Sequence, residues 1–182
     1  KSDTEIELMR AAAKIVEKGM KSAINHIKPG VRQCEAVAEI QKSLISGTPE
    51  FGGDYAGIVP MLPTGKGTSA SHLTWTEEKF IKGEATIIEL AGVYKKYHCP
   101  MARTVLLGEP NQKKIDTMKA TNEALDAGIS EVKPGKTCDE VAQKFWKILD
   151  KYGIKKSSRT GYSIGIGYPP DWGEHTDRKS VG

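Results

Sequence analysis

An internal repeat is the feature that most constrains the fold of this chain. Ile27–Gly30 (IKPG) and Cys34–Ala38 (CEAVA) recur about a hundred residues later as Val132–Gly135 (VKPG) and Cys138–Ala142 (CDEVA). Proline and glycine both oppose continuation of a helix, so each Lys-Pro-Gly is expected to end one. The matched cysteine and acid beside each turn favour a duplication over chance recurrence of a common turn.

Amphipathic helices are predicted on both sides of each turn. Before the turns, apolar residues recur every three or four positions, which is the helical period. A second helix is expected after each turn, over residues 34–45 and 138–151. Each copy is then a helix–turn–helix pair. The apolar positions before the turns are Ile6, Met9, Ala13, Val16, Met20, Ile24 and Ile27 in the first copy, and Ile115, Met118, Leu125, Ile129 and Val132 in the second.

Strands are predicted outside the helix pairs, where β-branched and apolar residues predominate. We expect strands over residues 55–61, 85–91 and 104–107, a hairpin turn over 92–97, and a further strand-like stretch over 157–167. A duplicated unit of paired helices and antiparallel strands predicts an α+β fold, with the helices covering one face of the sheet.

Composition excludes several classes of protein. A chain of 182 residues with 38% hydrophobic and 27% charged residues fits one globular domain. A net charge of +4 with scattered lysines does not indicate nucleic-acid binding. No apolar run approaches the roughly 20 residues of a membrane span, and no signal peptide is found. Cys34, Cys99 and Cys138 lack CxxC spacing, so we interpret them as reduced thiols of a cytoplasmic protein.

One segment carries a family resemblance: Ile87–Gly92 (IIELAG), followed by Tyr97–Thr104 (YHCPMART). It resembles the central metal-binding hairpin of the pita-bread peptidase superfamily, which includes methionine aminopeptidases, prolidases, aminopeptidase P and creatinase. That hairpin has an aspartate at the end of its first strand and a second aspartate eleven residues later. Here Glu89 and Pro100 stand at those positions, and proline cannot ligate a metal.

A third ligand position of the superfamily is also changed. Tyr162, within Gly161–Gly165 (GYSIG), stands where the metallopeptidases carry a ligating histidine. Tyrosine is a poor ligand for the divalent ions of these enzymes. With Glu89 as the one remaining ligand type, the resemblance implies no metal and no cofactor. Tyr162 is instead expected either to offer its hydroxyl to a substrate or to pack as an ordinary tyrosine.

Longer strings narrow the resemblance. The combination of ELAG, YHCP, ART, GYSIG and YPPDWGE closely resembles the ectoine hydrolases, a metal-free branch near creatinase. This implies hydrolysis of a C–N bond in a cyclic amidine, which opens ectoine or 5-hydroxyectoine to an acetylated diaminobutyrate. The implied partners are a small cationic or zwitterionic substrate and a second copy of the chain in a homodimer.

The resemblance also implies domain limits. It covers residues 1–176, which we expect to form a pita-bread catalytic-type domain with an antiparallel sheet. Two further glutamate-bearing strands of that fold are not found, so the domain is expected to be truncated at its C-terminus and could be too short for activity. Residues 177–182 are unassigned.

His72 and Glu89 are the candidate catalytic residues. In the superfamily a histidine at the place of His72 lines the substrate pocket and transfers protons, and an imidazole titrates near neutral pH. A surface-loop histidine is the alternative. Glu89 ends an apolar strand, where a carboxylate is costly to bury without a partner. It would either orient an amidinium or attack it as a nucleophile; the alternative is an edge-strand glutamate that faces water.

A loop near the end of the chain is a candidate substrate-binding wall. Two prolines stop any helix before Asp171, Trp172 and Glu174. The two carboxylates and the indole face would hold a small cation. The alternative is a well-packed surface turn.

Two other functions remain open at this point. One is a metal-dependent Xaa-Pro dipeptidase or aminopeptidase. The other is a non-catalytic binding module, since pita-bread domains also serve as interaction scaffolds.

Overall fold

The computed structural model describes residues 1–156 and 158–174 of the chain. The chain divides into two compact units, one formed by residues 1–109 and 164–174, and the other containing residues 110–163. The elements in chain order are α1 (Asp3–His26), α2 (Gln33–Ser46), the short 3-10 helix η1 (Gly65–Ser69), β1 (Ala85–Tyr94), β2 (Tyr97–Leu106), α3 (Gln112–Glu131), α4 (Cys138–Lys151), β3 (Ile164–Tyr168) and β4 (Asp171–Gly173).

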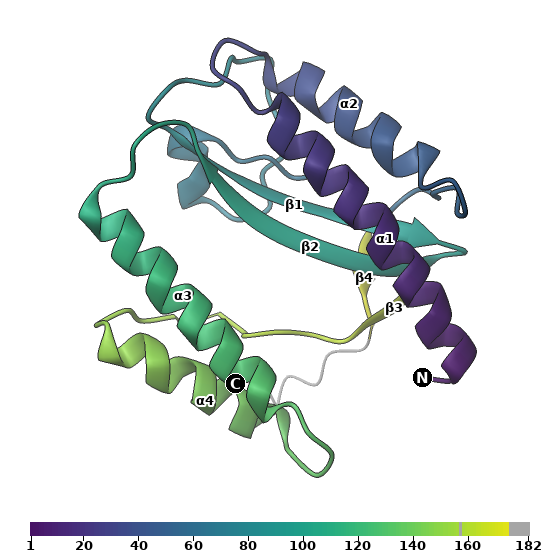
Figure 1. The fold of residues 1–182 in the computed structure, drawn as a ribbon, viewed down its shortest axis with the longest axis vertical. Helices are drawn as coiled ribbons and strands as arrows, with labels where there is room; N and C mark the ends of the chain where they lie inside the picture. Colours follow the sequence, from purple (N-terminus) through teal and green to yellow (C-terminus); the bar gives the residue numbers. More distant parts are fainter. Residues whose placement is uncertain (157, 175–182) are drawn as a thin grey trace. The chain divides into compact units, whose positions relative to one another are not determined.

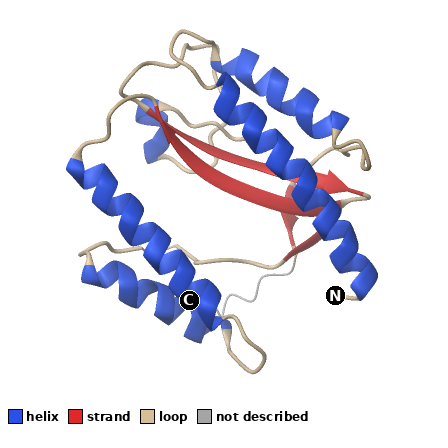
Figure 2. Ribbon diagram, in the orientation of Figure 1, coloured by secondary structure: helices blue, strands red, loops and turns tan. Residues whose placement is uncertain are grey.

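The first unit is a pair of helices on an antiparallel sheet (Figures 1 and 2). The strand order is β1-β2-β3-β4, and the long β1–β2 hairpin is its main part. Helix α1 packs against this hairpin and α2 packs against α1. Ile15 of α1, Ile40 of α2, and Ile88 and Leu90 of β1 are all fully buried in the core between them. The predicted α+β fold with helices over one sheet face is therefore confirmed.

Gly92 explains how closely α1 approaches the sheet. A Cβ atom at Gly92 would lie 2.2 Å from the carbonyl oxygen of Ala12 and 2.4 Å from the amide nitrogen of Val16. Only a glycine lets the two backbones approach this closely. The glycine that follows Leu90 and Ala91 is thus part of the packed strand.

The prediction of a turn over residues 92–97 was therefore wrong in extent. β1 continues to Tyr94, and β2 begins at Tyr97, well before residue 104. The turn is formed by Lys95 and Lys96 alone, at φ 47° and 68°. Two central residues with positive φ make a type I′ turn, whose twist matches that of a hairpin.

The strand predicted over residues 55–61 was also wrong. This segment is a loop, and only Met61 forms an isolated bridge, with Glu89. Within this loop the N–H of Gly57 donates to the side chain of His98, and directly before it the N–H of Asp54 donates to the carbonyl of Val93. In the region 157–167, β3 covers only residues from 164 onward, and residue 157 lies outside the described chain.

The second unit contains the other helix pair. Asn111 caps α3, and Thr137 forms a capping box with Glu140 at the start of α4. The two helices pack through small residues of α3 and larger ones of α4, chiefly Ala120, Ala124, Phe145, Ile148 and Leu149. The predicted helix ranges in both copies are confirmed. So is the matched turn, because Gly30 and Gly135 both adopt φ +87°, a conformation that favours glycine.

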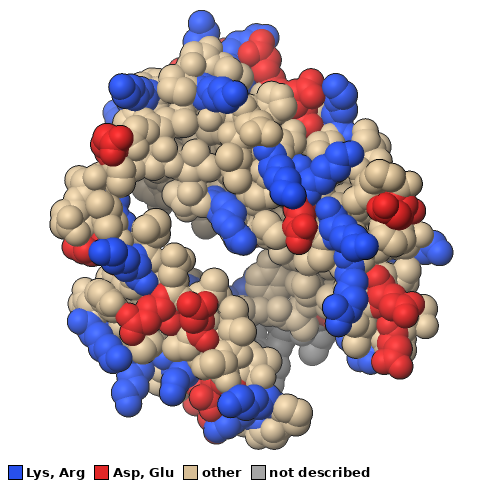
Figure 3. Space-filling view, viewed as in Figure 1, with Lys and Arg blue, Asp and Glu red and all other residues tan. Residues whose placement is uncertain are grey.

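The surface carries both signs of charge. Figure 3 shows lysine and arginine side chains interspersed with aspartate and glutamate on the face in view. None of the described helices combines the length and the apolar character needed to cross a membrane.

Candidate active site

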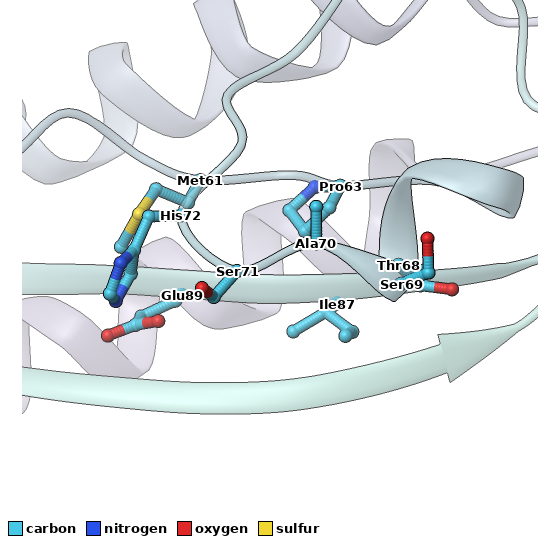
Figure 4. A pocket seen from close by; sticks show the side chains of 9 residues that line it. All are labelled: Met61, Pro63, Thr68, Ser69, Ala70, Ser71, His72, Ile87 and Glu89. Atoms are coloured by element: carbon cyan, nitrogen blue, oxygen red, sulfur yellow. The ribbon is translucent and has the colours of Figure 1, made fainter. Parts of the chain in front are cut away.

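A pocket of about 400 Å³ lies beside β1. Ile88 and Leu90 of β1 are buried under the helices, and side chains of a strand alternate between its two faces. Ile87 and Glu89 therefore point to the opposite face, and there they form one wall of the pocket. The lining residues are Met61, Pro63, Thr68, Ser69, Ala70, Ser71, His72, Ile87 and Glu89 (Figure 4).

The backbone of Glu89 is held on both sides. On one side it lies opposite Ala102 of β2. On the other, its N–H donates to the carbonyl of Met61 at 3.0 Å, and its carbonyl accepts from the N–H of Met61 at 2.8 Å. The N–H of Ile87 donates to the carbonyl of Pro63 at 3.0 Å. The segment from Met61 to Thr64 thus acts as an added edge to the sheet, and Glu89 lies inside it.

The carboxylate of Glu89 has no hydrogen bond or ion pair with any described residue, although the residue is half-buried. None of the described residues that line the pocket is a lysine or arginine. A half-buried carboxylate is stabilised most by a cationic partner or a hydrogen-bond donor. The pocket is therefore suited to a ligand that brings positive charge to Glu89.

His72 lies in the turn that covers the pocket and is exposed, with a backbone φ of +62°. Left-handed backbone at a residue other than glycine is uncommon and strained, and such strain often occurs at functional sites. Figure 4 shows the imidazole at the same end of the pocket as the carboxylate of Glu89. No ion pair joins the two among the described residues, so a ligand can contact both.

The hairpin supplies no further metal ligand beside Glu89. Pro100 lies opposite Ala91, and Ala102 lies opposite Glu89; neither side chain carries a donor atom. Within residues 1–156 and 158–174, no three histidine, cysteine, aspartate or glutamate side chains are grouped to hold a metal ion. The donor set of the described site therefore does not fit the metal centre of a dinuclear peptidase.

The sheet tolerates Pro100 because of its register. Tyr94 and Tyr97 close the hairpin, and hydrogen-bonded pairs alternate with non-hydrogen-bonded pairs from there. Ala91 and Pro100 form a non-hydrogen-bonded pair in this count. The nitrogen of Pro100 then faces away from β1, where no N–H is needed.

The three candidates near the end of the chain do not line this pocket. Trp172 is 1% exposed and packs with Met61 and Ala91 in a small core. The Oδ1 atom of Asp171 accepts hydrogen bonds from the N–H groups of Trp172 and Gly173, at 2.7 and 3.1 Å. Glu174 forms an ion pair with Lys1. Trp172 thus does not line the pocket itself but packs against Met61, which does.

Tyr162 belongs to the second unit. The residue is 37% exposed, and the guanidinium carbon of Arg159 lies 4.6 Å from the centroid of its ring. This is a cation–π geometry. A role for the Tyr162 hydroxyl in substrate binding stays a prediction.

His98 is a structural residue that the sequence did not reveal. It is fully buried, and its Nε2 atom accepts from the N–H of Gly57 at 2.9 Å. Its Nδ1 atom must then carry the proton, which it donates to the carbonyl of Lys96 at 2.8 Å. Burial lowers the pKa of His98. A neutral imidazole is therefore part of what holds the loop before Met61 in place.

Ser71 and Met61 are pocket residues that the sequence reasoning missed. Ser71 directly precedes His72, and this adjacency was the one available signal. Met61 enters the pocket because of its bridge to Glu89, which is a long-range contact. Such contacts leave no local pattern in the sequence.

Comparison with known proteins gives a consistent result. Residues 7–179 match the model of metallopeptidase family M24. The ectoine hydrolase of Halomonas elongata is 49% identical over 97% of this chain and 46% of its own length. The Xaa-Pro dipeptidase of Pyrococcus furiosus is 25% identical over 84% of this chain and 43% of its own. The chain spans about half the length of the curated relatives it matches.

Solved structures agree with the fold. The prolidase of Thermococcus sibiricus superposes with a TM-score of 0.82 and 26% identity, over 94% of this chain and 47% of that one. The Xaa-Pro dipeptidase of Bacillus anthracis gives 0.83 over 100% of this chain and 50% of that one, at 21% identity, which supports the fold alone. The pita-bread fold and the resemblance to ectoine hydrolases are confirmed, and the chain belongs to metallopeptidase family M24.

Proposed function

We propose that this protein is a metal-independent hydrolase that opens a cyclic amidine of the ectoine class at a C–N bond. The observation that carries the proposal is the half-buried Glu89 carboxylate, which has no partner among the described residues and faces a pocket whose described lining contains no lysine or arginine. His72 lines the same pocket. The 49% identity to a protein named ectoine hydrolase supports the choice of substrate.

The charge of the pocket suits an amidinium. This cation would pair with Glu89, whereas two divalent metal ions would repel it. The amidinium carbon is already electrophilic, so activation by a Lewis acid is less necessary. The family description implies a metal, but Ala102 opposite Glu89 and Pro100 opposite Ala91 carry no donor atoms, and the proposed reaction uses only Glu89, His72 and water.

The proposed chemistry forms one bond and breaks one. A water oxygen bonds to the amidine carbon while His72 accepts the proton of that water. The C–N bond of the resulting tetrahedral intermediate then breaks, and the leaving nitrogen takes the proton back from His72. In a second version Glu89 itself attacks the carbon, and water later cleaves the adduct. Mass spectrometry of trapped enzyme separates the two, because only the second version leaves an adduct on the Glu89 peptide.

The decisive experiment is an ectoine assay on the protein in its natural full length, with and without a chelator. We expect ring opening that the chelator does not reduce, and no stoichiometric metal by elemental analysis. About two bound ions per chain, together with loss of activity on chelation, would show a metallopeptidase-type site instead.

The same preparation tests the alternative functions. A relative named Xaa-Pro dipeptidase matches at 25% identity, so Xaa-Pro dipeptides belong in the assay. Turnover of these and not of ectoine would replace our proposal. Binding without turnover of any compound would indicate a non-catalytic module.

The cellular setting is part of the proposal. We expect a homodimer by resemblance to creatinase-type proteins, and a cytoplasmic location because the three cysteines are free in the structure. Light scattering of the full-length protein tests the first expectation. Fractionation of the host cells tests the second.

A further inference from the structure

Three hydroxyl side chains of the described residues line the pocket, and two of them already donate a hydrogen bond within the chain. The Oγ1 atom of Thr68 donates to the carbonyl of Gly65 at 2.7 Å, and the Oγ atom of Ser69 donates to the carbonyl of Lys66 at 2.8 Å. A hydroxyl has one proton to donate. These two groups can therefore accept a hydrogen bond from a ligand but cannot donate one without leaving η1.

Ser71 differs from both. Its side chain forms no hydrogen bond with any other described residue. Figure 4 shows its hydroxyl directed toward the end of the pocket that contains Glu89. Ser71 is thus the one hydroxyl in the described pocket lining whose proton is available to a ligand.

The charges of the lining indicate which ligand group Ser71 would meet. An ionised Glu89 only accepts hydrogen bonds, and it takes the cationic part of a ligand. A carboxylate on the same ligand would find no lysine or arginine in the described lining. Among the described side chains of the lining, its hydrogen-bond donors would be Ser71 and, where it is not transferring a proton, His72. A simple cation would pair with Glu89 and leave the Ser71 proton without an acceptor.

We propose that the Ser71 hydroxyl donates a hydrogen bond to the substrate carboxylate, so that the pocket selects compact zwitterions over simple cations. Met61, Pro63 and Ile87 form an apolar wall for the hydrocarbon part of such a molecule. The identity of the ring rests on the proposed function above. Ser71 is a specificity-determining residue in this scheme, and it takes no part in bond making or breaking.

The test compares two substrates that differ only in the carboxylate. Ectoine carries it, and 2-methyl-1,4,5,6-tetrahydropyrimidine is the same amidine ring without it. In the full-length protein, Ser71→Ala should lower kcat/KM for ectoine about tenfold or more, mainly through KM, because a hydrogen bond to a charged group is lost. For the ring without the carboxylate, kcat/KM should change less than about twofold. Ser71→Thr, which keeps a hydroxyl, should restore the preference.

Ser69→Ala is the matched control, since Ser69 lines the same pocket with its proton engaged. It should leave the ratio of the two kcat/KM values at the wild-type level. Equal losses for both substrates in Ser71→Ala would show that Ser71 serves the reaction or the fold, and no loss for either would show that it is a bystander. Both outcomes overturn the proposal, and thermal melting verifies that each variant is folded.

Failure of the proposed function gives a different result. If the wild-type protein opens neither ring, calorimetry of the two compounds replaces the kinetic ratio by a ratio of dissociation constants. If Ser71→Ala does not change the ratio of the two dissociation constants, Ser71 does not select for the carboxylate and the inference is refuted. Absence of binding for both compounds overturns the function and the inference together.

Discussion

The Nε2 atom of His98 accepts a hydrogen bond from the backbone N–H of Gly57, 2.9 Å away and 41 positions earlier in the chain. This contact ties the loop before Met61 to β2. It requires an imidazole without a proton on Nε2. Met61 lies beside Glu89 in the pocket. The protonation state of His98, which lies outside the pocket, therefore influences the stability of the loop that positions Met61.

The first prediction concerns pH. Burial lowers the pKa of His98 in the folded protein below its ordinary value of 6.5. Below about pH 6.5 the unfolded chain therefore binds a proton that the folded chain does not. The free energy of unfolding decreases as the pH is lowered through this range. Well above pH 6.5, as at pH 8, both states are neutral at this residue and its contribution is constant.

Urea unfolding at pH 8, 6.5 and 5 measures this effect. The transition midpoint should fall between pH 6.5 and 5 in the wild type, and less so in His98→Gln, which cannot titrate. His26→Gln serves as the control, because His26 lies on the half-buried side of α1 and bonds only within its own helix. An equal fall in wild type and His98→Gln would assign the pH dependence to other groups.

The second prediction concerns Glu89. Glu89→Gln should lower ectoine turnover about a hundredfold to a thousandfold, because the charge facing the substrate is removed. The free energy of unfolding should stay the same or rise slightly, since the carboxylate has no partner among the described residues to lose. Glu84→Gln, just before β1 and outside the pocket lining, is the control and should keep its activity. A strongly destabilised Glu89→Gln would show a structural carboxylate.

The third prediction separates chemistry from backbone strain at His72. Its φ of +62° suits asparagine but not a β-branched residue. His72→Asn should fold with wild-type stability and lose about a hundredfold in turnover, as expected for removal of a proton-transfer group. His72→Val should lose the same activity and about 1–2 kcal/mol of stability as well. Near-normal turnover by His72→Asn would remove this residue from the mechanism.

The fourth prediction concerns the approach of α1 to β1. Gly92→Ala places a Cβ atom 2.2 Å from the carbonyl oxygen of Ala12, so the helix must shift. We expect a loss of about 2–3 kcal/mol in the free energy of unfolding. Gly52→Ala has no atom within 4 Å of the new Cβ and should change stability by less than about 0.5 kcal/mol. Similar midpoints for both variants would contradict the close contact.

The helices were predictable because their signals are local. Apolar spacing and the two Lys-Pro-Gly turns lie within the segments that they organise. The hairpin turn was misjudged because Gly92 resembles a turn residue until α1 is seen against it. The loop over residues 55–61 has the composition of a strand, but the side chain of His98 accepts from its Gly57 N–H and the carbonyl of Glu89 accepts from its Met61 N–H. Neither partner can be inferred from the segment itself.

The site divides in the same way. Glu89 and His72 were identified through family resemblance, and the structure places both in one pocket. Ser71 could not be distinguished from Ser69 in the sequence, because the difference appears only in the structure: the Ser69 hydroxyl donates to the carbonyl of Lys66, whereas the Ser71 hydroxyl has no hydrogen bond with another described residue. Trp172 resembled a cation-binding residue on an exposed loop, yet it fills a gap beside Met61 and Ala91. Side-chain burial of this kind depends on segments far away in the chain.

The bridge between Met61 and Glu89 has an evolutionary consequence. The main chain alone fixes this position, through hydrogen bonds that any residue except proline could make. Pro100, in turn, lies at a position of β2 where the pairing with β1 uses no N–H donor. The family can therefore exchange the side chains at both positions while the hairpin stays the same. On such a scaffold, substitutions at a few side chains can change the reaction during evolution while the fold is retained.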